Sequence, residues 1–424
     1  MMCKSVPILP SGSYFRNQIN IMNTDMLTYL SKPTAMAFVQ KYGGVHPLLT
    51  QLESTRQDPI WHAEGDCLIH TNDVLTKVYE LIDFNPIAQA LSDREKMILM
   101  FSAMYHDYAK PVTTKDEERN GRMCVVASGH EFVGSSLLFN SEVPEELTQE
   151  EWLMVIKLVA YHQMPKKAVS KDFGEGEYIK LLRHCGDTRL LYLLEVADIE
   201  GRICNDADDE LLFLSLFKSC CEEYGVFCNY EEYYNRVIKP LEGELTSPTL
   251  YRGLSDFAEG KIHSLDTISC MNYAHERRPT IYLMCGLAGG GKSTYVNTHL
   301  ADCQYISLDM VRKELLKNEA DQSKNDEVRR IATNRLREML RTGNDVVFDA
   351  TFIRADHRAP ILELAHAYGY ASKIIVIQST IENSLSLMMS RSRTVPKEVL
   401  NDMYRGFQLP SLSEAEQIDF VLMK

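Results

Sequence analysis

The stretch Gly286-Leu-Ala-Gly-Gly-Gly-Lys-Ser-Thr294 follows an apolar run, residues 281–285, and leads into a helical pattern over residues 293–300. The order is therefore strand, glycine-rich loop and helix, which is the context that a phosphate-binding loop requires. Glycines let the backbone curl so that successive N–H groups face an anion, and the helix N-terminus adds partial positive charge there. We therefore predict a P-loop that binds a nucleoside triphosphate.

The side chains of this loop divide into two groups by their expected role. Lys292 would reach the β- and γ-phosphates, and the hydroxyl of Ser293 would ligate Mg²⁺. The residues expected to bind the nucleotide through the loop are Gly286, Gly289, Gly290, Gly291, Lys292, Ser293 and Thr294. The alternative interpretation is a glycine-rich turn without a ligand.

Beyond the loop, apolar strand patterns alternate with helical ones. Strands are expected at residues 304–308, 345–349 and 373–378, and a last apolar run at 420–423 closes the chain. Helices are expected at residues 327–340, 360–368, 382–390 and 397–404. Alternating strands and helices with continuous apolar strands predict an α/β domain with a parallel sheet.

Two carboxylates lie near the ends of predicted strands, where ligands bind in α/β domains. Asp309 is placed to accept the proton of an attacking hydroxyl, as a kinase requires, and Arg312 could bind an acceptor phosphate. The alternative interpretation of Asp309 is a helix N-cap, and one carboxylate can serve in both ways. Asp349 occupies a matching position and could orient Mg²⁺, a water or the acceptor.

Two arginines, Arg391 and Arg393, lie between two predicted helices. Paired guanidinium groups there could fold over a triphosphate as a lid and neutralise the charge that develops during phosphoryl transfer. Surface solvation is the competing interpretation.

The bulk properties indicate a folded protein of two to three domains, with 424 residues and a net charge of −14. Such a charge argues against a protein that coats nucleic acid generally. No signal peptide and no run of about 18 apolar residues is visible, so we expect a cytoplasmic protein without a membrane partner. The eleven cysteines lack paired zinc spacing and are expected to be free thiols.

The predicted divisions are residues 1–33, an N-terminal extension; 34–205, a helical domain; 206–274, a helical extension; and 275–424, the P-loop domain.

Residues from about 34 to 273 are mostly helical in pattern, as at 71–82 and 152–162, where apolar residues recur at three- and four-residue steps. Residues 120–127 are the exception and predict a turn or small hairpin.

This helical part contains an ordered set of histidines and aspartates: His70, His106, Asp107, His130, His162 and Asp198. Imidazole and carboxylate together suit divalent transition metals. Asp107 directly follows His106, so its carboxylate could bridge two ions, and a bridged pair performs phosphoester hydrolysis. Lys110 and Arg202 could hold the substrate phosphate. Taken singly, each histidine is more often a structural or surface residue.

The order of these residues resembles the HD-superfamily metal-dependent phosphohydrolases over about residues 61–202. The resemblance implies an all-α metal phosphohydrolase domain. His70, His106, Asp107 and Asp198 would hold a first ion, and His130 and His162, with Asp107, a second ion of the Mn, Co, Ni or Fe class. His62 would lie near the substrate. The segments around His70 and Asp198 are similar to HD domains that act on 2′-, 3′- and 2′,3′-cyclic phosphates of RNA.

The last third, about residues 279–424, resembles the phage-type 5′-hydroxyl polynucleotide kinase domain. The resemblance carries the glycine-rich loop, Asp309 with Arg312, and the arginine pair followed by residues 395–404. It implies Lys292 and Ser293 as phosphate and Mg²⁺ contacts, Asp309 as general base and Arg312 as acceptor-phosphate contact. Arg391 and Arg393 are closer together than in the phage enzyme, so which of them touches the phosphates is open.

Together the two resemblances match bacterial fusions of an HD domain with a polynucleotide kinase, which heal broken RNA ends. The expected activities are phosphorylation of 5′-hydroxyl ends by ATP or another NTP and removal of 2′,3′-cyclic, 2′- or 3′-phosphates. The expected partners are RNA or DNA ends and a separate RNA ligase. Two alternatives remain: a nucleoside or mononucleotide kinase fused to an HD nucleotidase, and a hydrolase gated by nucleotide binding.

Overall fold

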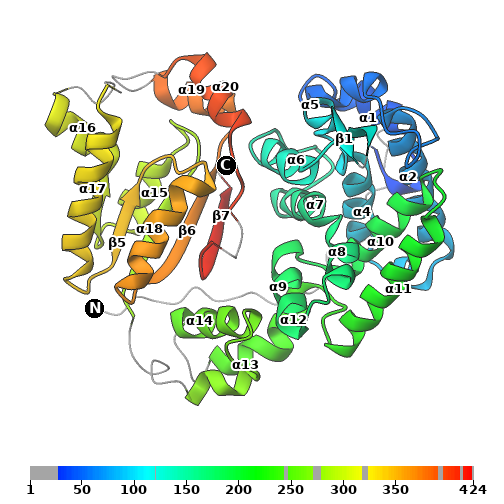
Figure 1. The fold of residues 1–424 in the computed structure, drawn as a ribbon. Coiled ribbons are helices and arrows are strands. Elements are labelled where there is room, and N and C mark those ends of the chain that lie inside the picture. The colour runs from blue at the N-terminus through cyan, green and yellow to red at the C-terminus, as the bar shows by residue number, and fades with distance from the viewer. Residues whose placement is uncertain are drawn as a thin grey trace, which may run out of the picture.

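A computed structural model describes residues 27–119, 121–242, 247–270, 278–317, 323–389, 395–410 and 414–422. Figure 1 shows two regions side by side, a helical one that includes α1 to α12 and a sheet flanked by helices. The expectation of a helical region followed by an α/β domain with a parallel sheet is confirmed. Within the described part of the chain, no helix combines the length and apolarity that a membrane crossing requires. None of the described cysteines forms a disulfide.

The helical region is built around α4 (Asp93–Tyr105), which contacts α2 (Cys67–Phe84), α7 (Gln149–Tyr161) and α10 (Thr188–Glu200). Every residue of α4 from Met97 to Tyr105 is buried, and a helix that is apolar all round belongs in a core. Because α4 ends at the centre of the region, the residues that follow it, His106 and Asp107, are delivered into the interior.

The remaining helices of this region surround that core. They are α1 (Ala35–Tyr42), α3 (Pro86–Gln89), α5 (Lys110–Thr113), α6 (His130–Phe139), α8 (Met164–Ser170), α9 (Glu175–Cys185), α11 (Ala207–Glu223), α12 (Tyr230–Tyr233), α13 (Lys239–Glu242) and α14 (Ser247–Ala258). Three 3-10 helices, η1 (Tyr29–Ser31), η2 (Pro47–Ser54) and η4 (Leu265–Cys270), and one π-helix, η3 (Tyr234–Ile238), accompany them in the described residues. α11 packs against α8 and α10, and α14 packs against α9, so the segment predicted as an extension lies on the helical region.

Two helices of this region that lead to site residues, α2 and α7, begin at side-chain caps. Asp66 accepts hydrogen bonds from the backbone N–H groups of Leu68 and Ile69, so α2 begins four residues before the periodic pattern that predicts it. α7 begins with a capping box in which Thr148 and Glu151 satisfy each other's backbone N–H groups. The cap of α2 fixes the first turn of that helix, which carries His70.

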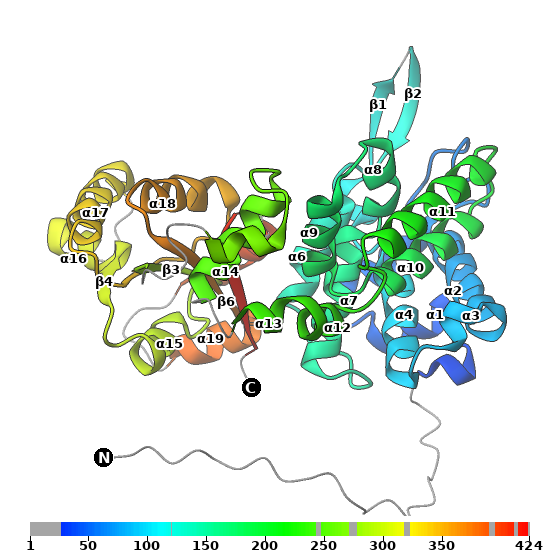
Figure 2. The same cartoon turned by 90° about the horizontal axis from the view of Figure 1, so that it is seen from below.

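A two-stranded antiparallel ribbon, β1 (Lys115–Arg119) and β2 (Arg122–Val126), interrupts the helices. Figure 2 shows this ribbon projecting from the body of the helical region. The sequence pattern predicts a turn or small hairpin at this place, and the structure adds the charged first strand, whose sequence has no apolar alternation.

The α/β domain has five parallel strands in the order β4-β5-β3-β6-β7. Their bounds are β3 (Thr280–Cys285), β4 (Gln304–Ser307), β5 (Val346–Asp349), β6 (Ala371–Gln378) and β7 (Gln417–Leu422). The helices are α15 (Lys292–His299), α16 (Leu308–Leu316), α17 (Asn325–Leu340), α18 (Ala355–Ala367), α19 (Ile381–Met389) and α20 (Lys397–Arg405). β3 lies at the centre, so the glycine-rich loop that follows it leaves the middle of the sheet.

The two regions contact each other at several places, among them α6 with α20 and the residues just after it. The ring of Phe139 stacks on Phe407 with centroids 5.7 Å apart, and the Tyr404 hydroxyl donates to the Leu137 carbonyl at 2.9 Å. The helix that begins at His130 therefore packs at its other end against the α/β domain.

Candidate functional site

Six histidine and aspartate side chains converge inside the helical region. His70 lies in the first turn of α2, His106 and Asp107 follow α4, His130 begins α6, His162 caps the end of α7, and Asp198 lies on α10. All six are buried. Five helices thus supply one cluster, and each residue stands at a helix end except Asp198.

The first group comprises His70, His106, Asp107 and Asp198. The Nε2 atom of His70 lies 3.1 Å from Asp198 Oδ1 and 3.4 Å from His106 Nε2. His106 Nε2 lies 3.2 Å from Asp107 Oδ2. Ligand atoms about 2.1 Å from one metal ion lie about 3 Å from each other, so this donor set fits a divalent cation. His70, His106 and Asp198 also have the mutual spacing of a metal site.

The second group comprises Asp107, His130 and His162. His130 Nε2 lies 3.1 Å from Asp107 Oδ1 and 3.3 Å from His162 Nε2. The two oxygens of the Asp107 carboxylate therefore face different groups, Oδ2 the first and Oδ1 the second. A carboxylate placed in this way can bridge two ions, and the donor set fits two.

The histidine rings are held so that Nε2 faces the cluster. The Nδ1 atoms of His106 and His130 lie 2.7 Å from the backbone carbonyls of Ala103 and Ala127, and the Nδ1 of His162 lies 2.8 Å from a carbonyl three residues earlier. A ring that donates from Nδ1 has its lone pair on Nε2, which is the form that binds a metal. The backbone carbonyls next to these three rings thus favour the tautomer that carries its proton on Nδ1.

His70 differs, because its Nδ1 lies 3.0 Å from the carboxylate of Glu64. Glu64 also contacts His62 Nδ1 at 2.8 Å and accepts a hydrogen bond from the backbone N–H of Ile203. Burial opposes the charge of Glu64, but hydrogen bonds from His62 and His70 outweigh it and hold the pKa of Glu64 below its usual range. The sequence interpretation missed Glu64, although it lies between His62 and His70.

Two cations flank the cluster. Lys110 Nζ lies 2.7 Å from Asp107 Oδ2 and donates to the Gln57 side chain at 2.7 Å, while Arg202 forms an ion pair with Asp198. Burial disfavours the charged form of Lys110, but the Asp107 carboxylate outweighs it and raises the pKa of Lys110. Burial likewise opposes ionisation of Asp107, yet His106 and Lys110 hold its pKa well below the usual range.

A cavity of about 260 Å³ opens beside this cluster. Its lining includes the predicted residues His62, Asp107, Lys110, His130, His162 and Arg202. Trp61, Gln57 and the ends of the β1–β2 ribbon complete the wall. The structure therefore places the two predicted phosphate-binding cations and His62 in the same cavity as the bridging carboxylate.

The second site is the glycine-rich loop between β3 and α15. Gly286, Gly289 and Gly291 have φ values of 151°, 76° and 93°, in the region that favours glycine. A Cβ at Gly289 would lie 2.7 Å from Met388 and 2.8 Å from the Ser384 carbonyl. The loop thus needs glycine for both its conformation and its close approach to α19.

The loop side chains meet the end of β5. Lys292 Nζ donates to the Gly286 and Leu287 carbonyls at 3.1 and 2.7 Å. The Ser293 hydroxyl donates to Asp349 Oδ2 at 3.1 Å, and the Tyr305 hydroxyl donates to the same oxygen at 2.9 Å. A serine hydroxyl beside a carboxylate is the arrangement that can hold Mg²⁺ in a P-loop domain. Thr294 is exposed in the first turn of α15, and Gly290 lies against Ser379.

The predicted N-cap alternative for Asp309 is wrong. The side chain of Ser307 caps α16 by accepting from the Asp309 N–H at 3.2 Å, and β4 ends at the same residue. Asp309 lies in the first helical turn, where its carboxylate forms an ion pair with Arg312. Arg312 is buried and also donates to Asn325 at 3.3 Å. The predicted lid residues Arg391 and Arg393 lie outside the described residues.

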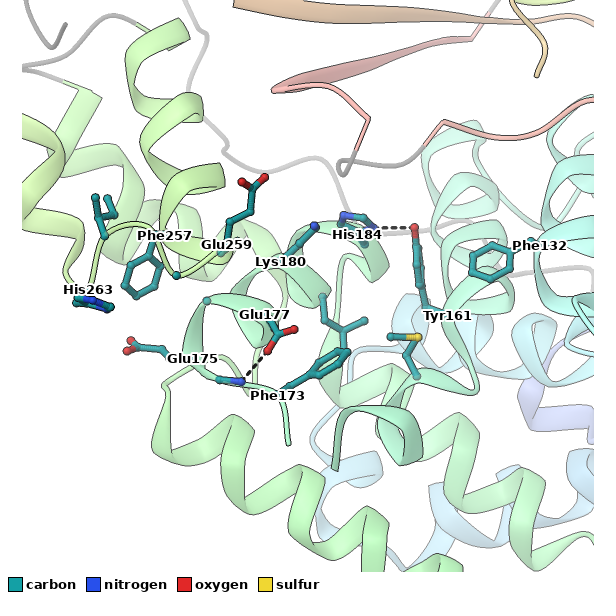
Figure 3. Close-up of a pocket in the computed structure, with 17 residues that line it drawn as sticks. Phe132, Tyr161, Phe173, Glu175, Glu177, Lys180, His184, Phe257, Glu259 and His263 are labelled. Atoms are coloured by element: carbon teal, nitrogen blue, oxygen red, sulfur yellow. Dashed lines mark hydrogen bonds between the residues drawn. The ribbon is translucent and has the colours of Figure 1, made fainter. Parts of the chain in front are cut away.

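A larger cavity of about 910 Å³ lies between α9 and the end of α14 (Figure 3). Figure 3 shows Tyr161 facing His184, whose Nδ1 lies 2.7 Å from the tyrosine hydroxyl. Burial lowers the pKa of His184 to about 3. None of the predicted site residues in the described ranges lines this cavity.

Comparisons with known proteins bear on the α/β domain. Residues 281–410 match the model of a protein family described as an AAA domain, which supports a P-loop domain in this region. No curated protein matches the chain.

Two solved structures overlap about a third of the chain. A putative kinase from Chloroflexus aurantiacus J-10-fl shares 16% identity at a TM-score of 0.28, covering 35% of this chain and 86% of that one. A gluconokinase from Sinorhizobium meliloti 1021 shares 18% identity at a TM-score of 0.26, covering 34% and 84%. At these scores the two likenesses carry no conclusion about activity.

Proposed function

We propose that this chain is a bifunctional enzyme that heals RNA ends, with an HD phosphohydrolase domain followed by a polynucleotide kinase domain. The observation that carries the first half is the Asp107 carboxylate, whose two oxygens face two groups of histidine Nε2 atoms. The second half rests on the P-loop with Ser293 beside Asp349 and on the position of Asp309.

In the helical site the donor set fits divalent ions, which when bound supply Lewis acidity for phosphoester hydrolysis. His70, His106, Asp107 and Asp198 would hold one ion, and Asp107, His130 and His162 the other. Lys110 and Arg202 are the charged groups that neutralise the substrate phosphate and orient it in the cavity. The reaction removes a 2′- or 3′-phosphate, or opens a 2′,3′-cyclic phosphate and then removes it.

In the α/β domain the loop N–H groups and Lys292 bind the β- and γ-phosphates of ATP or another NTP. Ser293 and Asp349 lie where they can hold the accompanying Mg²⁺. Asp309 accepts the proton of a 5′-hydroxyl as it attacks the γ-phosphate, and Arg312 contacts the acceptor strand. Arg391 and Arg393 would neutralise the leaving group. The products are the two ends that a separate ligase needs.

The test is a short RNA that carries a 5′-hydroxyl and a 2′,3′-cyclic phosphate. It is incubated with ATP, Mg²⁺ and Mn²⁺, Co²⁺ or Ni²⁺, and both ends are resolved, with a DNA of the same sequence alongside. We expect a 5′-phosphate to appear and the cyclic phosphate to disappear. If neither end changes, the proposal is wrong.

The cavity beside the histidine and aspartate cluster is small, which also suits a second candidate, a nucleotidase fused to a nucleoside or mononucleotide kinase. The same assay with free nucleosides and mononucleotides in place of RNA separates the two. Modification of free nucleotides with no change of the RNA ends would favour this second candidate. ATP hydrolysis without transfer to any acceptor would favour a nucleotide-gated hydrolase.

A further inference from the structure

Trp61 stands at the mouth of the hydrolase cavity, and the proposed reaction does not use it. The chain has two tryptophans, of which Trp152 is buried in the core and Trp61 is 37% exposed. Trp61 lines the cavity together with Lys110 and Arg202. A large aromatic ring that stays partly exposed beside two phosphate-binding cations is available to a ligand.

The ring is held in place by a buried anchor. The backbone N–H of Trp61 donates to the Asp58 carbonyl at 3.2 Å. The Asp58 carboxylate, which is buried, accepts hydrogen bonds from Arg122 at 3.1 Å to both oxygens and from the Val125 N–H at 3.1 Å. The loop that carries Trp61 and the β1–β2 ribbon are therefore fixed to the same residue, Asp58, the loop through its backbone and the ribbon through its side chain.

One face of the ring is occupied, because the guanidinium of Arg122 lies over it at 5.4 Å from the ring centroid. Since Asp58 fixes this guanidinium, the ring cannot turn without losing the cation–π contact. A ligand that enters the cavity therefore meets a preorganised aromatic surface, and stacking on it costs little side-chain entropy.

We infer that Trp61 is the base-stacking residue of the hydrolase site and binds the nucleobase of the terminal nucleotide. This inference rests on the proposed function, because it assigns the cavity to a nucleotide end. The phosphate lies toward Lys110 and Arg202, and the base lies at the rim against the indole. Stacking tolerates every base, since each has a π-face, so the site recognises a nucleotide without reading its sequence.

Stacking of one base on an aromatic side chain typically changes affinity by roughly five- to 150-fold. The test compares two RNAs with a 3′-phosphate, one with a normal terminal nucleotide and one with an abasic terminal ribose. Wild type should prefer the base-bearing end through a lower KM. In Trp61→Ala this preference should disappear, while Trp61→Phe should keep most of it.

Ile60→Ala is the matched control, because Ile60 is an exposed neighbour that does not line the cavity. It should keep the wild-type preference, and metal content should be equal in all variants. The role of Trp61 would be overturned if Trp61→Ala raised the KM for both RNAs equally, or if it left both KM values unchanged.

A binding measurement separates this inference from the proposed reaction. Adenosine 3′-phosphate should quench tryptophan fluorescence of wild type but not of Trp61→Phe, which retains only the buried Trp152, and glycerol 2-phosphate should quench neither. If no phosphate is released from either RNA but the fluorescence is quenched, the proposed hydrolysis is wrong and the proposed stacking of a base on Trp61 is supported. If the quench is absent, the stacking site is refuted whether or not phosphate is released.

Discussion

The two sites of this chain are built in opposite ways. The proposed hydrolase site gathers side chains from residues between His62 and Arg202, carried on several helices and the loops between them. The phosphate site is one continuous stretch, residues 286–294, completed by the end of a neighbouring strand. The first depends on the packing of helices around α4, and the second depends on the backbone conformation of a single loop.

Because the two sites are built differently, each depends on a different kind of neighbouring group to position its ligand-binding atoms. In the helical site the Nδ1 atom of each ligating imidazole lies next to an oxygen, which belongs to a backbone carbonyl or, for His70, to the Glu64 carboxylate. In the P-loop the ligand groups are mostly backbone N–H groups, so the requirement is for glycines and free space. We therefore expect charge-removing substitutions to damage the first site most and volume-adding substitutions to damage the second.

The largest expected effect is that of Asp107→Asn, because one substitution removes a charged ligand from both groups. The amide keeps the shape of the side chain but cannot bridge two cations as a carboxylate does. We expect metal affinity and phosphate release to fall by more than the roughly 10–100-fold that loss of an outer-shell partner costs. Elemental analysis of dialysed protein measures bound metal per chain.

The control for this prediction is His162→Gln, which removes a ligand from the second group only. It should lose one ion and keep the other. If Asp107→Asn still binds two ions per chain, the carboxylate does not bridge them, and the expectation that loss of charge damages the helical site most is wrong.

The next effect concerns the partner of His70. Glu64→Gln keeps an acceptor near Nδ1 but removes the charge, so we expect metal affinity to drop roughly 10–100-fold with the fold intact. Glu53→Gln, at an exposed position on η2, is the matched control and should have no effect. Competition with a chelator measures both affinities, and equal values for the two variants would show that Glu64 has no role at the metal.

A smaller effect is expected from alanine in the P-loop domain. Gly289→Ala and Gly343→Ala both put alanine at positive φ, 76° and 71°, which costs about 1–2 kcal/mol. Only Gly289 has neighbours within 3 Å of the added Cβ, whereas Gly343 has none within 4 Å. We therefore expect ATP affinity to fall about tenfold, equivalent to ~1.4 kcal/mol, in Gly289→Ala alone. Calorimetric titration with ATP and Mg²⁺ tests this, and similar losses in both variants would contradict it.

The smallest effect is a pH dependence of stability in the helical region. Burial lowers the pKa of His46 to about 4, and its ring lies 2.5 Å from the Tyr105 hydroxyl and 2.9 Å from the Glu142 carbonyl. Because the unfolded state binds the proton at a higher pH, stability falls as the pH drops from about 6.5 to about 4. Between pH 7 and 5.5 we expect a loss of about 1 kcal/mol from this group.

Urea unfolding followed by tryptophan fluorescence measures this loss, since both tryptophans lie in the helical region. His46→Gln should lose about 1 kcal/mol less than wild type over the same pH interval. Parallel pH profiles for the two proteins would mean that His46 does not carry the effect.

The contrast between a continuous site and a site assembled from several helices also explains how much of each region could be predicted from the sequence. The P-loop and the parallel sheet could be predicted because the loop is contiguous and because the strand next to it and its neighbours contain short apolar runs. The order of the histidines and aspartates could be recognised because all of them except Asp198 lie near the start or the end of a helix. Proximity of these residues in space comes only from the packing of α2, α4, α7 and α10 around one another.

Three other features of the structure could not be predicted, because the sequence pattern at each of them is also typical of a different structure. A glutamate before a helix, such as Glu64, is typical of a solvated surface, and its contact with His70 depends on the course of the loop. Ser307 and Asp309 are both good N-cap residues, and the end of β4 decided between them. The ribbon strand Lys115–Arg119 has five charged residues, so no apolar alternation marks it as a strand.

The central claim is that one chain carries two separate sites for the two ends of an RNA. The most direct measurement uses an RNA with a 5′-hydroxyl and a 3′-phosphate and compares wild type with Asp107→Asn and Lys292→Ala. Asp107→Asn should phosphorylate the 5′ end and leave the 3′-phosphate, and Lys292→Ala should do the reverse. The retained activity shows in each case that the protein is folded. Loss of both activities in either folded variant would contradict the account, because it would mean one shared site.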